Sequence, residues 1–137
     1  MPDLTGVLET CLYVDDLDRA SRFYEEVFGL RRIDGDDRLR AYSVAGRGVL
    51  LLFKRGASLK PAPDPAGVIS PHDGNGQLHF AFSIAASELS AWEKHLARNN
   101  VPIERRMHWP RGGTSIYFRD PDNNLGELAT PGLWEIY

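Results

Sequence analysis

The sequence contains a single cysteine, Cys11, among its 137 residues. One thiol cannot form a disulfide within the chain, and it cannot supply a zinc site that is built from several thiolates. Any metal ion bound by this chain must therefore use histidine and carboxylate side chains.

The sequence also lacks a long apolar run. The longest, residues 49–53, is far shorter than the roughly 20 residues that a membrane-spanning helix needs. The N-terminal segment has neither the charged nor the apolar region of a signal peptide. We therefore expect a cytoplasmic protein without a membrane partner.

Positive charge is not in excess. The 16 Lys and Arg residues are outnumbered by 19 Asp and Glu residues, which gives a formal net charge of -3. The basic residues form no stripe, so nucleic acid is not an expected partner. With 42% hydrophobic residues, the chain is long enough to bury one core and too short for two ordinary domains. It predicts one domain over residues 1–137.

The first half of the sequence predicts a βαβββ module over residues 6–55. Apolar and polar residues alternate in 6–14, as in a strand with two different faces. A helical pattern follows, with Asp15 or Asp16 as its N-cap and Gly29 at its end. Three further strands are predicted, at 30–34, 39–45 and 49–54.

The same order of elements returns in residues 77–132. The stretch between the halves, 56–76, is rich in proline and glycine, and we expect a linker or lid without regular structure there. The second half shows a helical pattern capped near Ser87, with Leu89, Trp92, His95 and Leu96 as its stripe. Its strands are predicted at 78–84, 103–108, 114–119 and 125–129. This internal repeat predicts an α+β fold in which two βαβββ modules form a curved mixed sheet.

Three side chains of metal-ligand type are predicted on the sheet face that the helices leave free. Glu9 and His79 occupy equivalent positions in the first strands of the two modules, and Glu127 lies in the last strand. Two carboxylates and one imidazole would neutralise a divalent ion and leave positions open for water or substrate. By spacing alone, a lone Glu in a strand is most often exposed to solvent, and a lone His beside Leu78 is more often a hydrogen-bonded structural residue than a ligand.

Three segments resemble the vicinal oxygen chelate superfamily of glyoxalases, bleomycin-resistance proteins and extradiol dioxygenases: LETCLYVDDLDRASRFYEEVFGL, LHFAFSI and TSIYFRDPDNNLGELA. The resemblance implies a divalent metal ion on the concave face of the sheet, bound by Glu9, His79 and Glu127, and Mn, Fe, Zn, Ni and Mg are all compatible. The sequence departs from the family at Glu9, where His is usual. It also departs at Leu51, which stands where glyoxalase I has a fourth ligand.

The closing segment is similar to fosfomycin-resistance enzymes. This similarity implies that Ser115 and Tyr117 contact the substrate, although Met107 stands where the thiol transferases of that group have a phosphonate-binding lysine. Arg111 and Trp109 are further candidate substrate contacts, because a guanidinium group matches the geometry of a carboxylate or phosphonate. His72 and Tyr117 are the candidate catalytic residues, His72 as a general acid or base if its loop folds over the site. A surface position for His72 remains the alternative.

The resemblance implies a metal-dependent enzyme that activates a small oxygenated substrate by Lewis-acid chemistry, of the lyase, isomerase, epoxide-opening or dioxygenase type. It also implies a homodimer, with Glu9 of one chain joining His79 and Glu127 of the other. The alternative is a metal-free protein that sequesters a ligand, as bleomycin-resistance proteins do. A third possibility is a relic of the fold with neither function.

Overall fold

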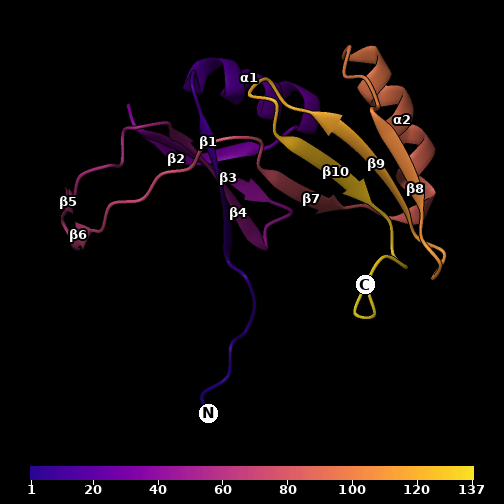
Figure 1. The fold of residues 1–137 in the computed structure, drawn as a ribbon, viewed down its shortest axis with the longest axis horizontal. Helices are drawn as coiled ribbons and strands as arrows, with labels where there is room; N and C mark the ends of the chain where they lie inside the picture. Colours follow the sequence, from indigo (N-terminus) through magenta and orange to yellow (C-terminus); the bar gives the residue numbers. More distant parts are fainter. The chain divides into compact units, whose positions relative to one another are not determined.

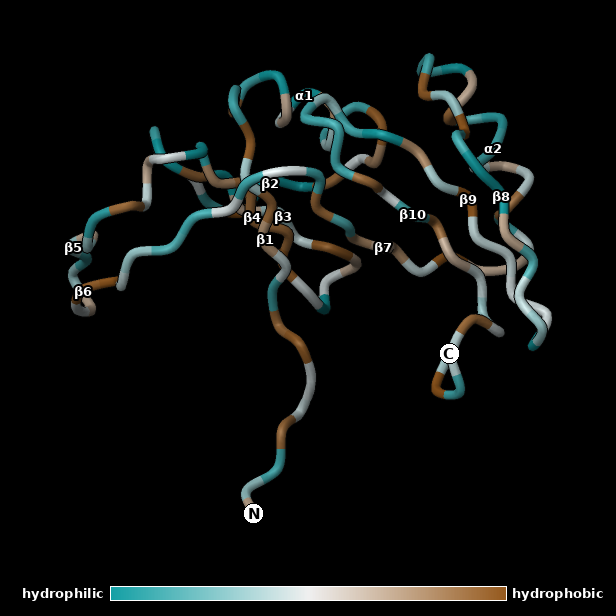
Figure 2. Tube along the Cα trace, in the orientation of Figure 1, coloured by the Kyte–Doolittle hydropathy of each residue, from teal (hydrophilic) through white to brown (hydrophobic).

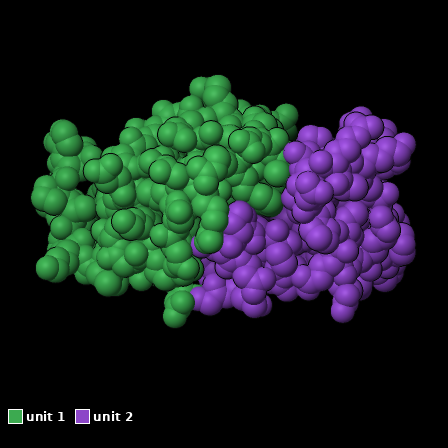
Figure 3. Space-filling model, turned by 90° about the horizontal axis from the view of Figure 1, so that it is seen from above, with its two compact units in different colours: residues 1–75 green, residues 76–137 purple.

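The computed structural model describes residues 1–137, which divide into two compact units, shown in different colours in Figure 3. No helix is long and apolar enough to span a membrane. Unit 1, residues 1–75, contains β1 (Glu9–Val14), α1 (Leu17–Phe28), β2 (Arg31–Gly35), β3 (Leu39–Val44), β4 (Gly48–Lys54), β5 (Ala62–Asp64) and β6 (Gly67–Ile69) (Figure 1). Unit 2, residues 76–137, contains β7 (His79–Ser83), a 3-10 turn η1 (Ala86–Glu88), α2 (Leu89–Arg98), β8 (Arg105–His108), β9 (Thr114–Arg119) and β10 (Leu125–Ala129).

Unit 1 has a four-stranded mixed sheet in the order β1-β4-β3-β2. The first and last strands of the module, β1 and β4, pair in parallel, and the other pairs are antiparallel. Helix α1 packs against β3 and β4. The apolar residues of this face are buried, with Leu12 and Val14 from β1 and Leu50 and Leu52 from β4 at the centre of the core.

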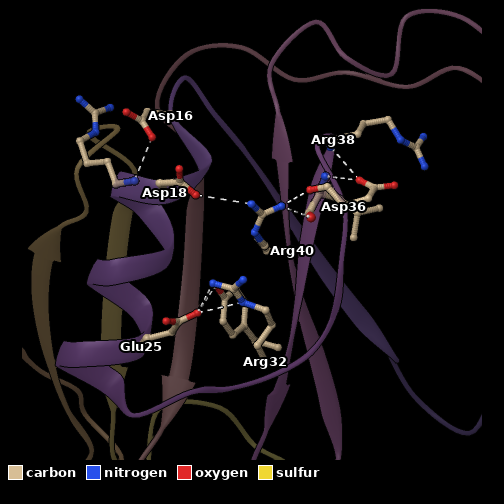
Figure 4. Close-up of polar contacts among 10 residues, drawn as sticks. Asp16, Asp18, Glu25, Arg32, Asp36, Arg38 and Arg40 are labelled. Atoms are coloured by element: carbon tan, nitrogen blue, oxygen red, sulfur yellow. Dashed lines mark hydrogen bonds and ion pairs between the residues drawn. The ribbon is translucent and has the colours of Figure 1, made fainter.

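Helix α1 begins and ends where the sequence predicts. The side chain of Asp16 accepts a hydrogen bond from the backbone N–H of Arg19, at 2.9 Å, and so caps the first turn (Figure 4). Gly29 ends the helix in the left-handed conformation, with φ of 62°. Glu25 ties the helix to β2 through Arg32, at 2.7 Å (Figure 4).

Unit 2 repeats the arrangement, with strands in the order β7-β10-β9-β8 and a parallel β7–β10 pair. Its core holds Phe80, Ile116, Phe118 and Leu128 from the sheet. In α2, Leu96 is buried, and the other residues of the predicted stripe, Leu89, Trp92 and His95, are partly buried. The cap predicted near Ser87 was wrong. The chain forms the η1 turn there, and Glu88 precedes α2 without a side-chain cap.

The strand registers of the two sheets match. In unit 1 Glu9 pairs with Val49, and in unit 2 the equivalent residue His79 pairs with Leu125. Val49 of β4 is therefore equivalent to Leu125 of β10. Two residues further along these strands, Leu51 is equivalent to Glu127. The internal repeat and the α+β class predicted from the sequence are confirmed, and each module has a mixed sheet of its own.

The prediction that residues 56–76 lack regular structure was wrong in part. Strands β5 and β6 form a small antiparallel hairpin there, and Pro63 lies in the middle of β5, paired with Val68. Proline is tolerated because a two-stranded ribbon leaves one side of each strand unpaired. Figure 2 shows that apolar residues also lie on the extended segment before β1, where Leu4 and Val7 are exposed.

Candidate functional site

One face of the unit 2 sheet gathers most of the candidate site residues. Residues that pair across strands share a face, and Glu127 of β10 pairs with Tyr117 of β9. By the same rule Ser115 lies on this face, beside Ala129, and His79 lies on it beside Leu125. The opposite face carries the apolar core residues of the same strands.

His79 and Glu127 lie next to each other, with 3.3 Å between Nε2 of the imidazole and Oε2 of the carboxylate. Nδ1 of His79 lies 2.9 Å from the carbonyl oxygen of Leu125. Because a carbonyl only accepts hydrogen bonds, Nδ1 must carry a proton and donate. In neutral His79 the lone pair is therefore on Nε2, which faces a carboxylate oxygen. Only a shared proton or a cation makes that contact favourable.

Glu127 has the features of a carboxylate that holds a cation. It is only 4% exposed, and its Oε1 atom has no hydrogen-bond partner. A buried carboxylate oxygen without a partner is costly, and a bound cation would satisfy it. The donor set of the pair, one imidazole and one carboxylate, therefore fits a divalent metal ion. The pair is not part of a larger cluster, since the structure contains no group of three or more His, Cys, Asp or Glu side chains that could hold a metal ion.

The other polar residues of this face form a connected set. Trp109 donates a hydrogen bond from its indole N–H to Oγ of Ser115, at 2.8 Å, and Ser115 is fully buried. Burial, then the negative charge of Glu127 and a hydrogen bond to it, raise the pKa of the Tyr117 hydroxyl, while a hydrogen bond with Ser115 opposes this rise. The structure thus brings five predicted residues together: His79, Trp109, Ser115, Tyr117 and Glu127.

Arg111 and Met107 are not part of this connected set of polar residues. Arg111 is exposed in the turn between β8 and β9, rather than on the sheet face. Met107 pairs with Ser115 in the β8–β9 register, so by the same rule it lies on the polar face, but it adds no charge to it.

Glu9 lies in unit 1, at the start of β1, and is exposed. Cys11 follows on the same face, where burial and then the charge of Glu9 raise the pKa of its thiol. Leu51 pairs with Cys11. An apolar residue thus fills the place in unit 1 that Glu127 fills in unit 2, and Leu51 provides no further metal ligand.

His72 is held against β1 and β4 by its loop. Its Nδ1 atom lies 2.9 Å from the hydroxyl of Tyr13, and its ring meets that of Phe53 edge-on with centroids 4.5 Å apart. Gly74 packs so closely on the Tyr13 ring that any larger residue would overlap it. Arg55 donates hydrogen bonds to the carbonyl oxygens of Gly74 and Tyr13 and so fixes the loop. His72 is therefore an ordered, partly buried residue.

The sequence did not single out Tyr13 as the partner of His72. The only signal was alternation in the first strand, which placed Tyr13 on the same face as Glu9. The contact depends on how residues 71–74 fold back, and a loop of that kind has no periodic pattern to read.

Comparison with known proteins supports one family. Residues 6–128 match the Glyoxalase/Bleomycin resistance protein/Dioxygenase superfamily. The metallothiol transferase FosB of Shouchella clausii is 28% identical, with 96% of this chain and 84% of that protein covered. The fosfomycin resistance protein FosX of Listeria innocua is 27% identical, with coverage of 96% and 94%.

A solved structure agrees with these relatives. The lactoylglutathione lyase of Agrobacterium tumefaciens superposes with a TM-score of 0.88 at 34% identity, and the match covers 98% of this chain and 99% of that one. The resemblance found in the sequence is thereby confirmed. The chain belongs to the Glyoxalase/Bleomycin resistance protein/Dioxygenase superfamily.

Proposed function

We propose that this chain is a metal-dependent enzyme that acts on a small oxygenated substrate, with His79, Glu127 and Glu9 as its metal ligands. One observation carries the proposal: the buried Oε1 of Glu127 has no partner, and it lies in a side chain whose other oxygen faces Nε2 of His79. Membership of a superfamily of largely metal-dependent enzymes supports it.

The three ligands would hold a divalent ion through one nitrogen and two carboxylate groups. Mn²⁺, Fe²⁺, Zn²⁺, Ni²⁺ and Mg²⁺ all accept such donors. When bound, the ion would act as a Lewis acid that stabilises negative charge on a substrate oxygen.

The residues around the pair would bind and orient the substrate. Tyr117 can donate a hydrogen bond to a substrate oxygen, because a phenol keeps its proton at neutral pH. Ser115 is held in place by the indole of Trp109. Arg111 is exposed, so it would reach an anionic group of the substrate only from the turn.

His72 is our candidate for a general acid or base. If Nδ1 of His72 donates to the Tyr13 hydroxyl oxygen, then Nε2 carries the lone pair and can take a proton from a substrate, and the imidazolium that forms can return it. A hydrogen bond that fixes the ring favours one tautomer, as catalysis by imidazole requires.

The relatives suggest two reactions. In one, a thiol or water opens an epoxide, as the names of the fosfomycin-resistance relatives suggest. In the other, lactoylglutathione is formed or cleaved, as the name lactoylglutathione lyase suggests. We propose that the substrate has adjacent oxygens, which either reaction provides.

Metal binding tests the proposal directly. The wild type and the variants Glu127→Gln and His79→Ala would be loaded in turn with Mn²⁺, Fe²⁺, Ni²⁺, Zn²⁺ and Mg²⁺, and the bound metal measured by elemental analysis. We expect one metal per chain in the wild type and at least about tenfold weaker binding in both variants. Glu104→Gln is the matched control, because Glu104 is an exposed carboxylate of unit 2 that is paired with Arg119.

The loaded protein would then be assayed with fosfomycin plus a thiol or water, and with methylglyoxal plus glutathione. Wild-type protein that binds none of the five metals would refute the proposal. Equal binding by the wild type and both variants would show that the metal lies elsewhere.

A metal-free protein that sequesters a ligand is the second candidate. Glu9 favours it, because this exposed carboxylate replaces the usual His at the first ligand position. Under this alternative, bleomycin would bind with equal affinity with or without added metal, and titration followed by tryptophan fluorescence would show it.

We also propose that the protein is a homodimer in which each site combines residues of both chains. Exposed apolar residues at both ends of the chain support this, with Leu4 and Val7 near the N-terminus and Trp134 and Ile136 near the C-terminus. The final residue, Tyr137, instead packs on its own unit, where its hydroxyl donates to the carbonyl oxygen of Ala129 at 2.9 Å.

A further inference from the structure

The turn that joins β9 to β10 contains a buried pair of polar side chains. Asp120 is 5% exposed and Asn124 is fully buried. One oxygen of Asp120 accepts hydrogen bonds from the backbone N–H groups of Asp122 and Asn124, at 3.0 and 2.8 Å. Its other oxygen accepts one from the side-chain amide of Asn124, at 3.0 Å. The pair is fully hydrogen-bonded, unlike the carboxylate of Glu127.

Asn124 connects this turn to another strand. Its side-chain oxygen accepts a hydrogen bond from the backbone N–H of Leu78, at 3.0 Å, and Leu78 immediately precedes His79. The orientation of the amide is fixed, because the carboxylate of Asp120 requires the NH2 group and the N–H of Leu78 requires the oxygen.

The residue that follows this turn, Leu125, also contacts Leu78 and His79. Asn124 precedes Leu125, whose N–H donates to the carbonyl oxygen of Leu78, at 2.8 Å. The carbonyl oxygen of Leu125 lies 2.9 Å from Nδ1 of His79. Asn124 therefore fixes the starts of β7 and β10 relative to each other, at the point where the imidazole is oriented.

Unit 1 shows that the fold does not need this pair. The registers place Val44 and Gly48 at the positions equivalent to Asp120 and Asn124. The equivalent backbone bond still forms, because the N–H of Val49 donates to the carbonyl oxygen of Leu8, at 3.0 Å. We call the hydrogen-bonded pair Asp120 and Asn124 the clamp. The two modules have the same strand pairing, but the clamp occurs only in the module that carries His79 and Glu127.

We propose that Asp120 and Asn124 are positioning residues that hold His79 with Nδ1 protonated and Nε2 beside Glu127, ready to bind a metal ion. This inference rests on the proposed metal site. Asp120 and Asn124 would act indirectly, because neither residue is a metal ligand. A metal-ligating imidazole that is fixed by a hydrogen bond on its other nitrogen binds more tightly, and loss of such support typically weakens binding about 10- to 100-fold.

The test replaces the clamp with the residues of the other module. The double variant Asp120→Val with Asn124→Gly has the residues found at Val44 and Gly48, and Asn124→Ala is a milder second variant in case the double variant folds poorly. We expect both to lose affinity for Zn²⁺ and Mn²⁺ about 10- to 100-fold in calorimetric titration. Circular dichroism would check that they remain folded.

An exchange variant separates positioning from simple loss of the native residues. Asp120→Asn with Asn124→Asp keeps every hydrogen bond described for the pair, because residue 120 still accepts the backbone N–H groups and its amide donates to the carboxylate at 124. Metal affinity should return to within about threefold of the wild type. The control is Asp36→Ala, which removes the carboxylate that accepts from the N–H groups of Arg38 and Leu39 in a unit 1 turn (Figure 4). It should leave metal affinity unchanged.

A second measurement does not depend on metal. Nitrogen-15 NMR of the metal-free protein reports which nitrogen of His79 carries the proton. We expect the Nδ1–H form in the wild type and the exchange variant, and a mixture of tautomers in the double variant. Wild-type metal affinity with both clamp variants, or an unchanged tautomer in them, would overturn the inference. If the wild type itself binds no metal, the proposed function fails, and the tautomer measurement still decides whether the clamp orients His79.

Discussion

At the scale of single residues, the sequence predicts which side chains share a sheet face wherever polar and apolar residues alternate regularly along a strand. It placed His79 and Glu127 on one face, and the structure puts their side chains 3.3 Å apart. Their roles as ligands stay predictions until metal binding is measured. The hydrogen bond from Trp109 to Ser115 could not be foreseen, because it depends on how the β8–β9 turn folds over the sheet.

Glu25 provides a residue-scale prediction about pH. Burial raises the pKa of Glu25, but hydrogen bonds from Arg32 and Tyr42 outweigh it and leave the pKa below its usual value. A lowered pKa in the folded state stabilises the protein above the unfolded pKa of about 4.3, and this contribution is lost as the pH falls through the folded value.

We therefore expect the urea midpoint of the wild type to fall between about pH 5 and pH 3, and to fall less steeply in Glu25→Gln. Glu26→Gln, at an exposed neighbouring position on the same helix, should keep the wild-type dependence. Parallel curves for the wild type and Glu25→Gln would contradict the prediction.

At the scale of elements, strong local signals gave correct boundaries and weak ones did not. Strands β9 and β10 have the predicted bounds because a clear alternation on each side is interrupted by the turn sequence Asp-Pro-Asp-Asn. The cap near Ser87 was wrong because the chain forms a 3-10 turn before α2, and a serine beside a turn has the same local pattern as an N-cap. The β5–β6 hairpin was missed because proline argues against a strand unless the strand is at an edge.

Residues 71–74 allow an element-scale prediction. A methyl group at Gly74 would overlap the ring of Tyr13, so Gly74→Ala should push the loop away and break the contact between Tyr13 and His72. We expect a loss of about 1–3 kcal/mol in the free energy of unfolding. NMR signals of the His72 ring should shift as they do in Tyr13→Phe.

The matched control for this change is Gly48→Ala. A methyl group there would lie 3.5 Å from the carbonyl oxygen of Leu8, an ordinary contact, so the stability should change little. If the two variants were equally stable and the His72 signals did not move, the loop would not be held as the structure describes.

At the scale of the whole molecule, the sequence predicted the internal repeat correctly because the order of elements is the same in both halves. The sites proposed to form between two chains give a test by mixing. Glu9→Gln and His79→Ala should each abolish metal binding alone. In a mixed dimer, one site would contain the intact Glu9 of one chain and the intact His79 and Glu127 of the other.

Equal amounts of the two variants, unfolded together and refolded, should therefore recover about a quarter of the wild-type metal if the chains pair at random. Elemental analysis after removal of free metal measures the recovery, and light scattering confirms the dimer. A mixture of Glu127→Gln and His79→Ala is the control and should recover none, since both changes fall on the same chain's part of the site. No recovery in the first mixture would exclude sites shared between chains.

The parallel pairing of β7 with β10 also has a consequence for synthesis of the protein. As the chain leaves the ribosome, β1 can join β4 once residue 54 has emerged, whereas β7 must wait for residues 125–129. N-terminal parts of a chain generally fold first during synthesis. Until residues 125–129 have emerged, β7 lacks its only partner strand, and Phe80 lacks its neighbour Gly126. A chain cut short before residue 125 would therefore have an aggregation-prone second half without Glu127, while the first half could still fold.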